Sequence, residues 1–161
     1  MNKGKLIFIG LVAILVLYFT FSYFFGNEEA KIKDIFDEAR MAFNKEDNGS
    51  LFADVAIEYQ DESGIKYLPA KFIMKKFFSR TDNVNLRIPN MSIIVSGKEA
   101  TAELEIILTG AKQGRGYHVL GKPGDPVIIV VGLKKGLTGW KVHSTQNVRP
   151  SKTYIHEEQE E

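Results

Sequence analysis

The longest apolar run of the chain begins at Leu6, ends at Phe25 and contains no charged residue. A helix of this length rises roughly 30 Å, which is about the thickness of the hydrocarbon core of a bilayer. Because a helix that is apolar on every side offers no face to water, it belongs in lipid or in a large core. The run therefore predicts a transmembrane helix over residues 6–25. Lys3 and Lys5 precede it, so we expect the first five residues in the cytoplasm and the rest of the chain across the membrane.

A cleaved signal peptide is the alternative interpretation of the same run. Signal peptides have an apolar core of about 7–15 residues and small residues before the cleavage site. This run is longer, and the bulky Phe24 and Phe25 stand where small residues are needed. We therefore expect an uncleaved anchor.

Beyond the run, the apolar residues follow the period of an amphipathic helix. They form one stripe, which consists of Ile32, Ile35, Phe36, Ala39 and Phe43. Asn27 is a typical N-cap residue, so we expect a new helix to begin there. The polar stretch that ends in Gly49 predicts the end of this helix and a left-handed turn.

Two further helices are expected before the first long strand. Ser50 is a typical cap residue for a short helical turn over residues 51–54. Pro69 suits the first turn of a longer helix that runs to about Arg80. The residues of this longer helix that we expect to face the core are Phe72, Ile73 and Phe77.

Apolar and polar residues alternate with a period of two in five segments, which predicts five strands. The segments cover residues 55–60, 84–95, 100–108, 127–133 and 140–144. In the second segment the apolar face changes parity around Pro89, which predicts a β-bulge. In the last segment Trp140, Val142 and Ser144 share one face. The glycine-rich residues 112–125 are expected to form a flexible loop.

Helices that come early and strands that come late predict an α+β domain over residues 27–149. In such a domain the helices cover one face of a curled antiparallel sheet. Residues 150–161 are polar and end in a run rich in glutamate, so we expect them to form a disordered acidic tail.

Composition narrows the classes of function. A net charge of +1 lacks the excess of basic residues that is typical of nucleic-acid-binding domains, so nucleic acid is not an expected partner. The chain has no cysteine, which excludes disulfides and thiolate chemistry and suits a bacterial envelope protein. No spacing of histidines and acids is typical of a metal site, and no Gly-Lys-Ser/Thr phosphate motif is present. We expect neither a metal nor a cofactor.

Four short segments carry a resemblance to a known family. They are Phe43-Asn44-Lys45-Glu46-Asp47, Leu51-Phe52-Ala53-Asp54-Val55-Ala56, Ser96-Gly97-Lys98-Glu99-Ala100-Thr101-Ala102 and Gly139-Trp140-Lys141-Val142. In this order they resemble segments of the nuclear transport factor 2-like superfamily, which includes ketosteroid isomerases and polyketide cyclases. The resemblance implies a cone-like sheet wrapped on the long helix, with a pocket at the wide end. It also implies that members are enzymes or binding proteins and that many form dimers through the sheet.

The catalytic residues of the isomerase-like members are not found at the matching positions. Those positions hold Phe36 or Ala39, then Gln60 and Val131, in a rough alignment. Phenylalanine and valine donate no hydrogen bond to an oxyanion, so we expect no catalytic residue of the isomerase type. The histidines, which are His118, His143 and His156, are expected on the surface.

Four polar residues are candidates for lining the mouth of the pocket. They are Tyr59, Gln60, Asp61 and Arg87. The alternative is that they are ordinary polar residues at the ends of strands. A carboxylate inside an enclosed pocket, beside a second polar group, would favour chemistry at Asp61.

The leading hypothesis is a membrane-anchored, non-catalytic binding or assembly domain on the extracytoplasmic face of a bacterial membrane. Its expected partners are the membrane, through residues 6–25, and either a second copy through the sheet, an envelope protein or a small apolar ligand. One alternative is a membrane-tethered lyase or isomerase that uses Asp61 or His118. Another is a scaffold component of a secretion or conjugation system.

Overall fold

The structure is a computed structural model that describes residues 3–150, and within this range the side chains of residues 3–11, 17–27 and 147–150 are outside the description. In the part of the chain described in full, no helix is long and apolar enough to cross a membrane. The predicted span lies mainly outside that part, since side chains are described there only for residues 12–16. The predicted acidic tail lies outside the described residues except for Pro150. The span and the tail both stay predictions.

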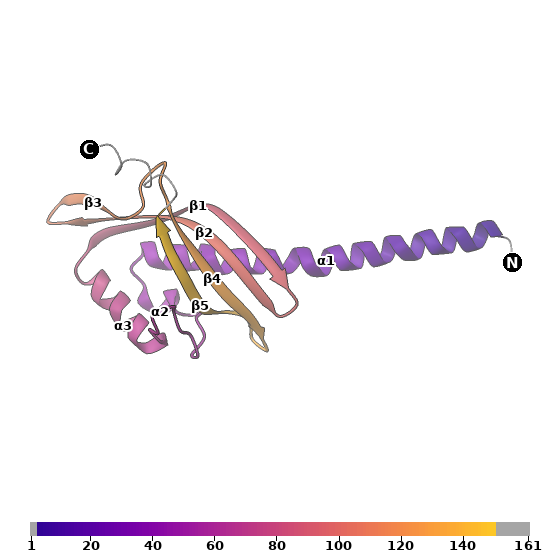
Figure 1. Cartoon of the computed structure of the whole chain (residues 1–161), viewed down its shortest axis with the longest axis horizontal. Coiled ribbons are helices and arrows are strands. Elements are labelled where there is room, and N and C mark those ends of the chain that lie inside the picture. The colour runs from indigo at the N-terminus through magenta and orange to yellow at the C-terminus, as the bar shows by residue number, and fades with distance from the viewer. Residues whose placement is uncertain (1–2, 151–161) are drawn as a thin grey trace, which may run out of the picture.

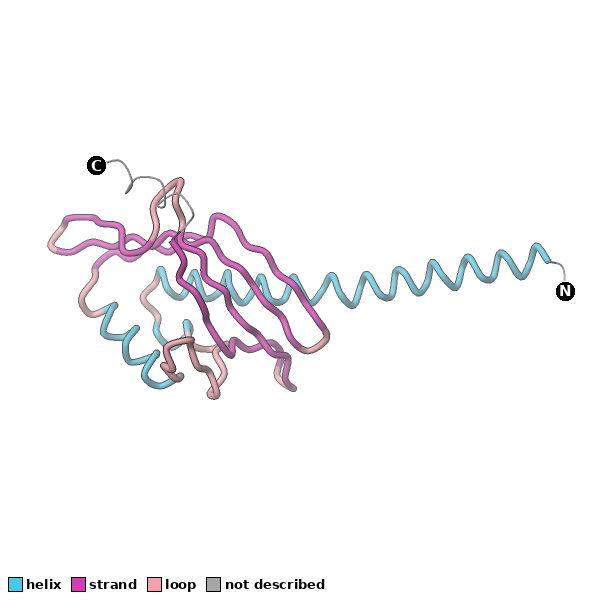
Figure 2. The backbone as a smooth tube through the Cα atoms, in the orientation of Figure 1, coloured by secondary structure: helices cyan, strands magenta, loops and turns pink. Residues whose placement is uncertain are grey.

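A single long helix, α1 (Lys3–Asn44), contains 42 residues and extends well beyond the sheet on its N-terminal side (Figures 1 and 2). The expectation that a new helix begins at Asn27 is wrong, because the helix continues through that residue. A capping residue starts a helix only where the preceding backbone is not helical, and here the preceding residues are helical as well. The predicted apolar stripe is confirmed, since Ile32, Phe36 and Phe43 are buried.

The end of α1 is a left-handed turn, as the sequence predicts, but the left-handed residue is Glu46 with φ 57° and not Gly49. The amide of Asp47 donates to the carbonyl of Ala42 at 2.9 Å, and that of Glu46 donates to Phe43 at 3.0 Å. This is the Schellman arrangement, which satisfies carbonyls at the end of a helix.

Two short helices follow. The carboxylate of Asp47 caps α2 (Asn48–Leu51) by accepting hydrogen bonds from the amides of Gly49 and Ser50. We had expected Ser50 to be the cap, but the cap is Asp47. The second helix is α3 (Tyr67–Phe78), which has Pro69 in its first turn as predicted.

One antiparallel sheet follows α3 (Figure 1). Its strands are β1 (Asp82–Ser96), β2 (Glu99–Lys112), β3 (Arg115–Leu120), β4 (Val127–Gly136) and β5 (Gly139–Pro150). The order across the sheet is β1-β2-β4-β5, and β3 pairs with the last part of β2. The bulge expected near Pro89 is confirmed, because the β1–β2 register shifts between Arg87 and Asn90.

The loop expected over residues 112–125 contains a hairpin, in which β3 pairs with the last part of β2. Gln113 and Gly114 have φ values of 52° and 78°, and two such residues make the tight turn that suits a twisted hairpin. The irregular part is confined to residues 121–126. A Cβ on Gly121 would lie 2.7 Å from the carbonyl oxygen of Ile106, so this loop passes the sheet too closely for any other residue.

The strand expected over residues 55–60 is absent, and an irregular segment runs along the edge of β5 instead. The amides of Ala56, Gln60 and Glu62 donate to carbonyls of β5 at 2.9–3.1 Å. The alternation that suggested a strand does not correspond to burial, since Ile57 is 82% exposed. The segment still covers an edge that would otherwise be open to another strand.

The main core lies between α1 and the concave face of the sheet. It includes Ile32 and Phe36 of α1, Leu104 of β2, and Leu133 of β4. A second cluster joins Phe43 to Val84 and Leu108, with Phe77 and Phe78 of α3 packed against it. The predicted α+β class with a curled antiparallel sheet is confirmed.

The outward side of α3 differs from the prediction. Phe72 and Ile73 were both expected in the core, but Phe72 is 67% exposed on the outward side, and Ile73 is 51% exposed on the side that faces the rest of the domain. Phe77 does pack inward, with its ring centroid 6.1 Å from that of Phe43. Two apolar stripes are therefore present on this helix, and only one of them meets the rest of the domain.

Candidate functional site

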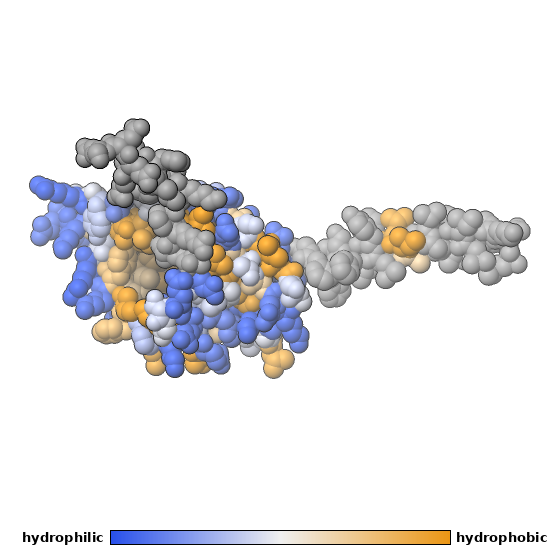
Figure 3. All heavy atoms as spheres, viewed as in Figure 1, coloured by the Kyte–Doolittle hydropathy of each residue, from blue (hydrophilic) through white to orange (hydrophobic). Residues whose placement is uncertain are grey.

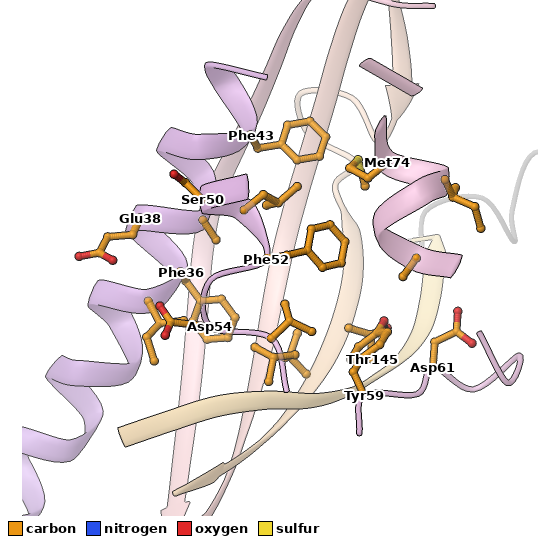
Figure 4. Close-up of a pocket in the computed structure, with 18 of the residues that line it drawn as sticks. Phe36, Glu38, Phe43, Ser50, Phe52, Asp54, Tyr59, Asp61, Met74 and Thr145 are labelled. Carbon is orange, nitrogen blue, oxygen red and sulfur yellow. The ribbon is translucent and has the colours of Figure 1, made fainter. Parts of the chain in front are cut away.

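A cavity of about 340 Å³ lies between α1, the segment that follows it, α3 and the sheet (Figure 4). This volume is within the range of small-molecule sites, about 300–1,000 Å³. The lining side chains are mainly apolar and come from Ile35, Phe36, Ala39, Phe43, Leu51, Phe52, Val55, Ile65, Ala70, Ile73, Met74, Val131 and Val142. Polar atoms enter the lining through Glu38, Ser50, Asp54, Tyr59, Asp61 and Thr145.

Aromatic rings form the upper wall of the cavity. Figure 4 shows Phe36 and Phe43 projecting from α1 and Phe52 projecting from the segment after α2, with Met74 of α3 across from them. The helical spacing of residues 36 and 43 puts both rings on one side of α1. A methionine opposite aromatic rings gives an adaptable surface, because its thioether side chain is flexible and polarisable.

The most buried polar pair of the cavity consists of Tyr59 and Thr145. Their hydroxyl oxygens are 2.7 Å apart, and either one can be the donor. Burial raises the pKa of the Tyr59 phenol, and the nearby Asp61 carboxylate also raises this pKa, so the phenol stays protonated. One hydroxyl accepts the hydrogen bond of this pair, and its own O–H remains available as a donor. The pair can therefore donate a hydrogen bond to an oxygen atom of a ligand.

Thr145 reaches this position because of a bulge in β5. The β4–β5 register shifts by one residue between the Gly132–Ser144 and Leu133–Val142 pairs. The shift puts Val142 and Thr145 on the cavity side, whereas the sequence predicted Val142 and Ser144. Strict alternation cannot reveal a bulge in a segment without proline or glycine, and this is why Thr145 was missed.

Two of the three carboxylates in the lining, those of Asp61 and Asp54, are held by neighbouring groups. Asp61 Oδ1 accepts hydrogen bonds from the amides of Ser63 and Ile65 at 2.9 and 2.8 Å, so it organises its own turn. Asp54 forms an ion pair with Lys141 at 2.8 Å. Both carboxylates therefore stabilise the loops that build the wall.

The structure separates the four candidate residues into two groups. Tyr59 and Asp61 line the cavity, with Tyr59 beside Thr145 and Asp61 at the edge of the site (Figure 4). Gln60 is exposed and does not line the cavity. Arg87 is exposed on β1 and is also outside the lining.

The positions that the family resemblance assigned to catalysis can also be located. Phe36, Ala39 and Val131 line the cavity, whereas Gln60 does not. His118 is exposed on β3, and His143 is half-buried beside a shallow depression of the surface. In the described part of the chain, histidines and acids form no group of three or more that could hold a metal ion.

Comparison with known sequences finds no protein-family model and no curated protein that matches this chain. Comparison with solved structures does find similar proteins. A nuclear transport factor 2-like superfamily protein from Salmonella enterica matches with a TM-score of 0.66 and 18% identity, over 82% of this chain and 97% of that one.

Two further solved structures are similar. A nuclear transport factor 2-like protein with a cystatin-like fold from Novosphingobium aromaticivorans has a TM-score of 0.60 and 12% identity, over 85% of this chain and 86% of that one. A protein with a cystatin-like fold from Nostoc punctiforme has a TM-score of 0.56 and 20% identity, over 76% of this chain and 92% of that one. At such low identity the likeness concerns the fold, and fold does not determine function. The domain therefore has the nuclear transport factor 2-like, or cystatin-like, fold.

Proposed function

We propose that this protein is a membrane-anchored, non-catalytic domain that binds a small, mainly apolar ligand at the extracytoplasmic face of a bacterial membrane. The single observation that carries the proposal is the apolar cavity of about 340 Å³ between α1, α3 and the sheet. Apolar walls with a few convergent polar groups are typical of small-molecule sites.

The chemistry of the lining supports binding more than catalysis. The Tyr59–Thr145 pair offers a neutral hydrogen bond, while Asp61 and Asp54 are held by backbone amides and by Lys141. We therefore expect a neutral ligand with an apolar body and one oxygen atom that faces the hydroxyl pair. The anchor rests on the uninterrupted apolar run of residues 6–25, which belongs to the same helix as the wall of the cavity.

The ligand proposal can be tested with 2-naphthol, an aromatic alcohol of suitable size. The chain has four methionines, and only Met74 of the three described ones lines the cavity. In the full chain, labelled with carbon-13 at the methionine methyl groups and reconstituted in lipid nanodiscs, 2-naphthol should shift the Met74 signal in a saturable manner. The signal of Met41, which is 45% exposed on α1, should not move.

A pair of substitutions provides the control. Ala70→Phe adds a ring to the cavity wall and should weaken 2-naphthol binding at least about tenfold, which is roughly 1.4 kcal/mol. Ala53→Phe places the same ring on an exposed residue outside the cavity and should leave binding unchanged. Equal shifts of all methionine signals would mean that the probe only partitions into the lipid, and the proposal would fail.

A second candidate function is a membrane-tethered lyase or isomerase, and the position of Asp61 at the cavity edge favours it. Asp61→Asn keeps an oxygen that accepts from the amides of Ser63 and Ile65, but it removes the negative charge. If Asp61 is a general base, the full chain should accelerate deuterium exchange next to the carbonyl of 2-tetralone, and Asp61→Asn should abolish that acceleration. No acceleration by the unmodified protein would count against this reaction.

A further inference from the structure

One side of α3 carries exposed apolar and basic residues in alternation. Leu68, Lys71, Phe72 and Lys75 are spaced as one stripe of a helix. Leu68 is 73% exposed and Phe72 is 67% exposed. Figure 3 shows hydrophilic and hydrophobic side chains next to each other where Figure 1 places α3. Exposed apolar residues that cluster together, unlike scattered ones, mark binding surfaces.

This stripe forms one wall of a groove, which we call the α3 groove. Its other wall is the turn after α1, through Glu46 and Asn48, and Phe78 closes one end. The volume of the groove is about 530 Å³. It lies outside the ligand cavity, whose wall is made by the opposite side of α3.

Asn48 adds an observation about the kind of occupant. Its amide nitrogen donates to the carbonyl of Lys71 at 3.1 Å, which ties the two walls of the groove together. Among the described side chains, the Asn48 Oδ1 atom is the buried oxygen that lacks a hydrogen-bond partner. After a small turn of the side chain, a backbone amide of a peptide in the groove could donate to this oxygen, and this would remove an unfavourable unsatisfied acceptor.

The charge of the groove selects the chemistry of the occupant. Lys71 and Lys75 line it, Lys76 follows on the same helix, and Glu46 is the one acid in its lining. An acidic segment with apolar side chains therefore complements it. A lipid surface is disfavoured if the proposed anchor is correct, because α3 lies near the C-terminal end of α1, and residues 26–44 of that helix rise roughly 28 Å away from the span.

This chain contains a segment of the complementary chemistry. Residues 151–161, which lie outside the described residues, read Ser-Lys-Thr-Tyr-Ile-His-Glu-Glu-Gln-Glu-Glu. Tyr154 and Ile155 supply apolar side chains, and four glutamates follow them.

The length of this segment is sufficient to reach the groove. Pro150 pairs with Val127 of β4, which pairs with Ile106 of β2. Two strand spacings cover about 10 Å. Leu108, two residues along β2, belongs to the cluster in which Phe78 of α3 packs. Ile155 is five residues beyond Pro150 and reaches up to about 17 Å when extended, which is sufficient for the end of the groove at Phe78, and the six residues after it can continue along α3.

We propose that residues 151–161 dock in the α3 groove of their own chain. Tyr154 and Ile155 cover Phe72 near the Phe78 end of the groove, and the glutamates that follow run along α3 toward Leu68, beside Lys71 and Lys75. Because Ala70, Ile73 and Met74 on the opposite side of α3 line the ligand cavity, the docked segment braces one wall of that cavity from outside.

The absence of native cysteine permits a direct test by disulfide trapping in the full chain. The test pair is Lys75→Cys with Glu158→Cys, which keeps both apolar contacts. The control pair is Arg115→Cys with Glu158→Cys, since Arg115 is an exposed basic residue on the β2–β3 hairpin. Under mild oxidation, the test pair should form an intrachain disulfide at least about tenfold faster than the control pair.

A second variant examines the apolar contacts. Adding Leu68→Ser and Phe72→Ser to the test pair should slow trapping to about the rate of the control pair. Both residues are exposed, so the domain should still fold, and fluorescence of Trp140, the single tryptophan, checks this. Equal rates for the test and control pairs would overturn the proposal. Disulfides formed mainly between two chains would also overturn it and would assign the groove to a second copy.

Discussion

Glu46 occupies a left-handed backbone conformation, with φ 57°, that is unfavourable for any residue except glycine. Because glycine adopts this conformation without a Cβ clash, Glu46→Gly should stabilise the domain by about 0.5–1 kcal/mol. The measurement is the free energy of urea unfolding, followed by Trp140 fluorescence. Glu38→Gly, inside α1 and six residues before its end, is the matched control and should destabilise by about 1 kcal/mol.

The hydroxyl pair in the cavity can be examined by a double-mutant cycle. Tyr59→Phe and Thr145→Val each remove one oxygen of the 2.7 Å contact and keep most of the side-chain volume. We expect a coupling of about 0.5–1.5 kcal/mol in the free energy of unfolding, because the pair is half-buried. Tyr117→Phe, on an exposed tyrosine whose hydroxyl makes only a long 3.4 Å hydrogen bond to Thr81, should change stability by less than about 0.5 kcal/mol. A coupling near zero would show that the two hydroxyls act independently.

At the scale of elements, Glu28 connects α1 to the sheet. Its carboxylate accepts a hydrogen bond from Trp140 Nε1 at 2.7 Å and forms ion pairs with Lys135 at 2.7 Å and Lys31 at 2.9 Å. Hydrogen bonds from the two lysines are the main reason that the pKa of Glu28 is lowered from 4.5 to about 2. Burial opposes this shift but is outweighed.

This lowered pKa predicts how stability depends on pH. Folding favours the ionised carboxylate, so the contribution is complete above pH 4.5 and is lost as the pH falls toward about 2. The shift corresponds to at most about 3 kcal/mol, and since both lysines are partly exposed we expect about 1–2 kcal/mol. Glu28→Gln should lower the free energy of unfolding by this amount at pH 7. The difference from the unmodified protein should shrink between pH 5 and pH 2, and a difference independent of pH would contradict the explanation.

At the scale of the whole molecule, the same helix carries the predicted span and one wall of the cavity. The proposed function includes a membrane orientation, which can be tested by labelling. Leu137 is fully exposed in the turn between β4 and β5, which makes it a suitable labelling site.

Single-cysteine variants should reveal the orientation, because the chain has no native cysteine. In intact bacterial spheroplasts, a membrane-impermeant maleimide should label Leu137→Cys and should label Asn2→Cys only after lysis. The opposite pattern would reverse the predicted topology. Labelling of both variants in the absence of a membrane fraction would argue against the anchor.

Much of the architecture follows from local pattern. The stripe through Ile32, Phe36 and Phe43 predicted a helix buried on one side, and the alternation along β2 predicted a strand with one buried face. The parity change at Pro89 predicted the bulge in β1. Each of these signals depends on residues a few positions apart, so the sequence by itself was sufficient.

Other features were decided only by contacts between distant parts of the chain. Residues 55–60 alternate like a strand, yet carbonyls of β5 hold them in an irregular path. Thr145 faces the cavity because a bulge in β5 shifts the register against β4, and Phe72 is exposed because only the other side of α3 meets the domain. Tyr59 and Thr145 are 86 positions apart, and no local pattern reports such a pairing. The elements are therefore local in origin, whereas the cavity depends on how they pack.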